Sequence, residues 1–252
     1  MSSLPDKHEP EEQLAEGTLM SHLLELRSRL MKAVLAVVAV FVCLVPFANR
    51  VFEYVSKPLR EALPEGSQMI VTDVAAPFLT PFKTAFFVAL FIAMPVVLFQ
   101  VWQFVAPGLY KREKRFAVPL MASSIVLFYA GIAFAYFIVF KLMFRFFASV
   151  TPGGVEMTPD ISAYLSFVLG LFLAFGVAFE VPIATVMLIW SGLVSVKSLR
   201  SARPYVFLGA FVVGMFLTPP DVFSQTLLAI PMYLLYEAGL VMARIMLPEK
   251  TA

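Results

Sequence analysis

Charged and metal-binding side chains are scarce in this sequence. Asp, Glu, Lys and Arg make up only 14% of its 252 residues, whereas soluble domains contain roughly 25%. There is one cysteine, Cys43, and there are two histidines, so neither a disulfide framework nor a thiolate metal site is expected. The HExxH, GxSxG and P-loop motifs of common enzymes are also missing. We therefore expect no enzyme and no metal or other cofactor. We also expect no nucleic-acid partner, although the net charge of +2 by itself says little.

Apolar side chains dominate instead. They account for 60% of the residues, and the mean hydropathy is +0.87. A helix needs about 20 apolar residues to cross a bilayer. Six apolar segments stand out, at residues 30–48, 84–105, 116–147, 161–194, 205–217 and 222–242. The sequence therefore predicts an all-α integral membrane protein with six transmembrane helices.

The predicted spans differ in length. The third and fourth have more than 30 residues each, so they must tilt, kink or project from a hydrocarbon core of ~30 Å. Pro182 predicts a kink in the fourth span. The fifth has only 13 residues, about 20 Å of helix, and the turn "TPPD" leads directly into the sixth. We expect short fifth and sixth helices in a concave, cup-like bundle; an ordinary short hairpin packed against longer neighbours is the alternative.

Polar segments flank the six-helix domain, which we place at residues 18–244. The acidic segment 1–17 has no apolar core, so we expect a disordered cytoplasmic tail there and no signal peptide. Residues 245–252 form a second, C-terminal tail. With six spans, thirteen Lys and Arg residues fall on the side of the termini and six on the other side. The positive-inside rule then predicts that both termini are cytoplasmic.

Three residues near that side are candidates for polar or interfacial contacts. The segment 18–30 places leucines on one helical face, which predicts an amphipathic helix on the membrane surface before the first span. Within it, Glu25 is spaced to pair with Arg29. Glu113 lies among four basic residues of the first cytoplasmic loop, where it balances charge or favours the start of the third span. Phe104 ends the second span, as an interfacial aromatic anchor does.

Glu180 is a carboxylate inside the fourth apolar segment. A charge at the centre of a bilayer costs about 2.5–3.5 kcal/mol, and ionisable residues within spans usually mark functional sites. Glu180 is either a structural carboxylate facing other helices or a contact for a proton, an ion or a partner helix. At the last hairpin, Asp221 is placed to cap the sixth span. Glu237 can pair with Arg244 only if the two intervening helical turns bring them together.

Five motifs between about Met20 and Arg244 resemble one protein family, in order and with the expected six spans. They are "SHLLELRSRL", "FVAPGLYKREKR", "FAYFIVF", "AFGVAFEVPIA" and "RPYVFLGAFVVGMFLTPPDVFSQTLLAIPMYLLYE". Together they are similar to the C subunit of the twin-arginine protein translocase, the TatC family.

This resemblance implies a multi-pass receptor in the bacterial inner membrane. Such a receptor binds the twin-arginine signal peptides of folded proteins. It exports them together with TatA- and TatB-type single-span subunits, using the proton-motive force. It also associates with further copies of itself and contacts the surrounding membrane lipid. The positions that match the family's signal-binding motifs are Glu25, Arg27, Phe104 and Glu113. The positions that match its intramembrane polar and partner contacts are Glu180, Met215, Thr218, Asp221 and Gln225.

The chemistry of these residues agrees with a receptor. Two adjacent guanidinium groups are bound best by carboxylates in bidentate geometry, and Glu25 and Glu113 offer two carboxylates from separate segments. The main alternative is a proton-coupled secondary transporter of a small solute, with Glu180 as its coupling site. We find no inverted repeat of the kind that supports such a transporter. A scaffold without sequence-specific recognition is a weaker alternative.

Overall fold

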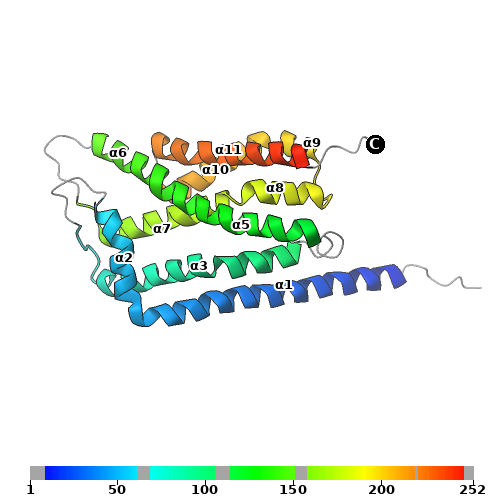
Figure 1. Ribbon diagram of the computed structural model, residues 1–252, viewed down its shortest axis with the longest axis horizontal. Helices are drawn as coiled ribbons and strands as arrows, with labels where there is room; N and C mark the ends of the chain where they lie inside the picture. The colour runs from blue at the N-terminus through cyan, green and yellow to red at the C-terminus, as the bar shows by residue number, and fades with distance from the viewer. Residues whose placement is uncertain (1–8, 62–68, 106–113, 151–157, 219–220, 247–252) are drawn as a thin grey trace, which may run out of the picture.

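The computed structural model describes residues 9–61, 69–105, 114–150, 158–218 and 221–246, and these are helical apart from turns and one isolated bridge. The long helices lie side by side along the long axis, and α2 (Ala48–Glu61) crosses them at one end (Figure 1). We name this the α2 end, and the opposite end, which holds the short α9 (Val196–Ser201), the α9 end. The described chain starts and finishes at the α9 end (Figure 1).

The first helix, α1 (Glu9–Leu44), is continuous over 36 residues. Two expectations are wrong here. Segment 18–30 does not lie apart on the membrane surface but continues into the first span, and helix already covers residues 9–17 of the segment expected to be disordered. Residues 1–8 lie outside the described part of the chain. The reason for the continuity is local, because residues 18–44 contain neither proline nor glycine to interrupt the helical hydrogen bonds.

Sequence analysis did not predict α2, which follows α1 after a 3₁₀ turn at Val45–Phe47. Its Phe52 and Val55 side chains pack toward the core, while Arg50 and Tyr54 are exposed. α2 packs against α3 (Ala76–Val105) at the α2 end. Because α2 is short and amphipathic, a search for long apolar segments passes over it.

The long third span is distorted rather than straight. It consists of α5 (Lys114–Phe134), a π-helical segment (Ala135–Val139) and α6 (Phe140–Val150). A π-helical turn widens the helix locally and changes the direction of the side chains that follow it. Val139 and Phe140, at and just after this segment, are buried in the largest apolar cluster of the protein. Side chains at and just after the π-helical segment therefore face the core.

The fourth span breaks where the sequence predicts. α7 (Ile161–Ala178) ends two residues before α8 (Val181–Trp190), with Phe179 and Glu180 between them. Pro182 stands in the first turn of α8, where its missing N–H has no intrahelical partner. The predicted kink beside Glu180 is confirmed. Half of the residues in this span's most apolar window are buried, against 11% for the first span. The fourth span therefore forms the centre of the bundle, and α1 lies at its lipid-facing edge.

The last two helices differ in length. α10 (Arg203–Leu217) has 15 residues, about 22 Å, so the prediction of a short fifth helix is confirmed. The prediction of a short sixth helix is wrong, because α11 (Val222–Met246) has 25 residues and is long enough to cross a bilayer. The apolar segment weakens at Glu237, but that carboxylate is paired with Arg203 and the helix continues. Five long apolar helices and the shorter α10 make this a multi-pass membrane protein.

Two connections at the α2 end are tied together by Asp160, the N-cap of α7. Ile70 and Asp160 form an isolated parallel bridge. The Asp160 carboxylate accepts hydrogen bonds from the Ala163 N–H at 2.9 Å and from the N–H and hydroxyl of Thr72 at 2.8 Å each. These bonds, led by that of Ala163, lower the pKa of Asp160 from 3.8 to about 2. The ionised carboxylate therefore joins the segment before α3 to the start of α7.

This geometry predicts a pH-dependent stability at low pH. A carboxylate whose pKa is lowered on folding stabilises the fold above its unfolded pKa, about 3.9. That stabilisation is lost as the pH falls through the folded pKa of about 2. We expect Asp160→Asn to unfold at a lower temperature than the wild type at pH 6, and the difference to shrink between pH 4 and pH 2. Thermal unfolding in detergent measures this, and a difference that does not change with pH would contradict it.

Candidate functional site

At the α9 end, a polar contact joins α1 to α3. The Nη2 atom of Arg29 lies 3.3 Å from Oε1 of Glu25, one turn earlier in α1, so the predicted pair is confirmed. The Nη1 atom of Arg29 donates to Oε1 of Gln103 in α3. The side chains of Arg29 and Glu25 are 25% and 34% exposed. The Glu25 carboxylate is thus held against the bundle while part of it faces solvent.

The other residues predicted for this end fall in three positions. Phe104 directly follows Gln103 in α3 and is half-buried, so it lies beside the α1–α3 contact. Arg27 is exposed on α1. Glu113 lies outside the described residues, and its approach to Glu25 stays a prediction.

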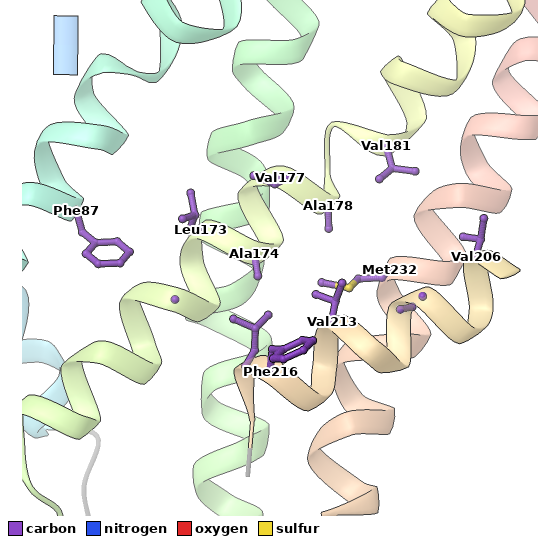
Figure 2. A pocket seen from close by; sticks show the side chains of 14 residues that line it. Phe87, Leu173, Ala174, Val177, Ala178, Val181, Val206, Val213, Phe216 and Met232 are labelled. Carbon is purple, nitrogen blue, oxygen red and sulfur yellow. The ribbon is translucent and has the colours of Figure 1, made fainter. Parts of the chain in front are cut away.

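An apolar groove of about 710 Å³ separates α7 and α8 from α10 (Figure 2). Val177 and Val181 lie on one side of it, Val206 and Val213 on the other, and Met232 of α11 lies behind them (Figure 2). None of its lining residues has a polar side chain. They are Phe87, Gly170, Leu173, Ala174, Val177, Ala178, Val181, Val206, Gly209, Ala210, Val213, Phe216, Leu217 and Met232.

Glu180 does not line this groove, although its neighbours Ala178 and Val181 do. Its Oε2 atom accepts a hydrogen bond from the Ser124 hydroxyl of α5. Its Oε1 atom is buried and has no hydrogen-bond partner among the described residues. The carboxylate therefore connects α5 to the break between α7 and α8. Because buried carboxylate oxygens are usually hydrogen-bonded, Oε1 can accept a donor from outside the described chain.

The hairpin between α10 and α11 places its predicted residues in different surroundings. Met215 is 52% exposed on α10. Thr218 is buried, and its hydroxyl donates to the carbonyl of Gly214 at 3.0 Å. Gln225 of α11 lies against Gly214, where a Cβ atom would stand 3.6 Å from its backbone. A Cβ atom at this position would make an ordinary van der Waals contact with α11, so α10 and α11 pack against each other here.

Asp221 caps α11 as predicted. Its Oδ1 atom accepts a hydrogen bond from the backbone N–H of Ser224 at 2.7 Å. Its Oδ2 atom and the Ser224 hydroxyl oxygen are buried and have no partner among the described residues. Polar groups that remain to be satisfied therefore lie at the start of α11, next to the exposed face of α10.

Sequence analysis missed a polar cluster that holds α9 and α10 against α11. Arg203 Nη2 lies 2.6 Å from Glu237 Oε2, whose other oxygen accepts from the Tyr233 hydroxyl at 2.9 Å. One turn away, the Tyr236 hydroxyl donates to the Leu199 carbonyl at 2.5 Å. Glu237 thus pairs with Arg203 and not with Arg244. The two partners are 34 positions apart, so no local pattern could indicate this pair.

These features suit binding rather than covalent chemistry. In the ranges that the structure describes, no three His, Cys, Asp or Glu side chains come together as metal ligands would. A partly exposed carboxylate stands at the α9 end, and a groove without polar side chains lies within the bundle. The first can bind a cationic group, and the second can hold an apolar chain or helix.

Comparisons with known proteins agree with this description. The family model "Sec-independent protein translocase protein (TatC)" matches residues 21–231. A protein of that name from Azotobacter chroococcum mcd 1 is 64% identical over 221 residues, which cover 88% of this chain and 87% of the relative. One from Escherichia coli strain K12 is 59% identical over 226 residues, which cover 90% and 88%.

A solved structure shows the same fold. The crystal structure described as "Twin Arginine Translocase Receptor- TatC" superposes with a TM-score of 0.81 at 38% identity, covering 89% of this chain and 98% of that one. The family model spans most of the chain, and the relatives are matched over nearly their full lengths. The chain therefore belongs to the TatC family, whose members are components of the Sec-independent protein translocase and not enzymes.

Proposed function

We propose that this TatC subunit binds signal peptides with two consecutive arginines at its α9 end, in the cytoplasm. The contacts of Arg29 with Glu25 and with Gln103, beside Phe104, carry the proposal. They fix one carboxylate against α3 and leave it partly exposed. A guanidinium group can bind such a carboxylate through two parallel hydrogen bonds, which an ammonium group cannot.

Specificity for arginine follows from competition at this carboxylate. Arg29 already occupies part of Glu25, and Arg27 adds positive charge nearby, so long-range attraction of basic peptides is weak. An incoming arginine therefore gains binding free energy only when it pairs closely and in the right orientation with the Glu25 carboxylate. Glu113 would supply the second carboxylate for the neighbouring arginine, and Phe104 an apolar contact for the residues that follow.

The apolar groove and the α10–α11 hairpin would serve the membrane-embedded partners. The groove offers an apolar surface to the hydrophobic stretch of the signal peptide. Met215, Thr218, Asp221 and Gln225 would contact TatA- and TatB-type single-span subunits. The buried polar atoms at the start of α11 that have no partner among the described residues support this contact. Glu180 would accept a hydrogen bond from a partner or signal helix through its Oε1 atom. Transport at the wild-type rate by both Glu180→Gln and Glu180→Ala would contradict that role.

The proposed setting is the bacterial inner membrane, with the α9 end in the cytoplasm. The excess of basic residues on the side of the termini supports this orientation. Folded cargo would be exported with the partner subunits and further TatC copies, using the proton-motive force.

Peptide binding tests the proposal directly. A labelled signal peptide with Arg-Arg or Lys-Lys is titrated against the wild type, Glu25→Gln and Glu113→Gln in nanodiscs. One charge-assisted bidentate pair contributes about 1.5–3 kcal/mol, so we expect the wild type to prefer Arg-Arg by at least about tenfold. Each variant should lose most of that preference.

A matched control is Glu53→Gln, which removes an exposed carboxylate of α2 at the opposite end of the bundle. It should bind both peptides as the wild type does. If every protein binds Arg-Arg and Lys-Lys alike, Glu25 and Glu113 are ordinary surface charges and the proposed site is wrong.

A further inference from the structure

A lysine lies beyond the α2 end of the apolar groove. Phe87 of α3 and Gly170 of α7 both line the groove. Lys83 is one helical turn before Phe87, and Ser166 is one turn before Gly170. Lys83 Nζ donates to Ser166 Oγ at 2.5 Å, so the two positions meet across α3 and α7. The ammonium group therefore stands about one turn, ~5 Å, past the last residues of the groove.

The charge of Lys83 is not balanced within the described part of the chain. None of the carboxylates described there lies within ion-pair distance of it, and Ser166 is neutral. The Ser166 hydroxyl donates to the Ser162 carbonyl at 2.5 Å, so its oxygen is turned to accept from the ammonium group. Lysine has three N–H donors, and two of them remain for an anion.

The depth of Lys83 matches a lipid headgroup. Lys83 is exposed and lies seven residues after Ala76, the first residue of α3, about 10 Å along the helix. Lysine side chains near the ends of spans extend toward the headgroup region, since a charge deeper in the membrane is costly. An anion at this position is therefore at the level of lipid phosphates.

The length of the groove selects among apolar occupants. Along the fourth span the groove runs from Gly170 to Val181, about 16 Å, which is half of a hydrocarbon core of ~30 Å. That is the depth of one leaflet, counted from the α2 end. A transmembrane helix would continue past the groove, whereas an acyl chain ends within it.

We propose that a phospholipid of this leaflet occupies the groove, with an acyl chain between α7 and α10 and its phosphate beside Lys83. Apolar walls bind the chain, and the Lys83 ammonium group, which pairs with no carboxylate among the described residues, binds the phosphate. This lipid site goes beyond the proposed signal recognition, which assigns the same groove to the hydrophobic stretch of the signal peptide, so the lipid would occupy the groove only while no signal peptide is bound there.

The test is lipid binding to delipidated protein in detergent, followed by native mass spectrometry. The probes are dioleoyl phosphatidylglycerol and dioleoylglycerol, which share their chains and differ in the phosphate-bearing headgroup. A lysine near an anionic lipid contributes to the free energy of binding through charge attraction. Lys83→Gln should therefore weaken phosphatidylglycerol binding about fivefold. Binding of dioleoylglycerol should not change. Lys57→Gln, which removes an exposed lysine of α2 at the same end, is the control and should bind both lipids as the wild type does.

Three outcomes would overturn the proposal. Equal loss in Lys83→Gln and Lys57→Gln would mean only general attraction of anionic lipid. Unchanged phosphatidylglycerol binding in Lys83→Gln would remove the phosphate contact. If a single-span peptide with a glutamate at this depth needs Lys83 and phosphatidylglycerol does not, the partner of Lys83 is a protein carboxylate.

Discussion

Replacing Gly131 by valine is expected to lower the midpoint of thermal unfolding in detergent by about 10 °C. A Cβ atom at Gly131 of α5 would stand 2.4 Å from the carbonyl oxygen of Phe175 and 3.0 Å from Gly176 Cα in α7. Both contacts are backbone atoms at the centre of the bundle, so no side chain can rotate away. Overpacking of this kind costs about 3 kcal/mol, and the crossing of α5 and α7 must widen.

The same substitution at Gly209 is the matched control. Gly209 lies in α10, and a Cβ atom there meets nothing within 4 Å. Gly209→Val should therefore melt within about 2 °C of the wild type, because surface substitutions usually change stability by no more than ±0.5 kcal/mol. If both variants melt together, the approach of α5 to α7 is not a rigid feature of the fold.

Features that depend on local sequence could be predicted. The apolar segments locate all six spans, because a span must bury its backbone polar groups in helix whatever its neighbours are. Pro182 marks the break after Ala178, since a proline suits the first turn of a helix, where its missing N–H has no intrahelical partner. The Glu25–Arg29 pair and the Asp221 cap follow from spacings of four and three residues.

Features that depend on distant contacts could not be predicted. The Arg203–Glu237 pair joins α10 to α11 across 34 positions of the sequence. The direction of Glu180 is set by Ser124 of α5, 56 positions away, which turns the carboxylate away from the groove. α2 is stabilised by packing on α3 rather than by its own hydrophobicity.

The surface of the groove offers a second strong prediction, Gly209→Leu. Gly209 is an exposed lining residue of the groove, with open space at its Cβ position. A leucine there extends into the groove between α7 and α10 without meeting the protein's own backbone. The exchange also removes a glycine from the helix interior, and this removal by itself stabilises the helix by about 0.5–1 kcal/mol. We therefore expect a protein that unfolds at the wild-type temperature or above and yet docks apolar segments poorly.

Export of a folded twin-arginine substrate and cross-linking of its signal peptide to α10 measure the effect. A helical segment that can no longer bury several of its methylene groups in the groove loses ~0.8 kcal/mol of binding free energy for each. It should therefore bind at least about tenfold more weakly. Gly209→Ala, which adds one carbon, should lie between the leucine variant and the wild type. Val212→Leu enlarges an exposed side chain of the same helix outside the groove and should change neither readout. Normal export by Gly209→Leu would mean that apolar segments dock elsewhere. If export is lost instead, the stability measurement excludes misfolding as the cause.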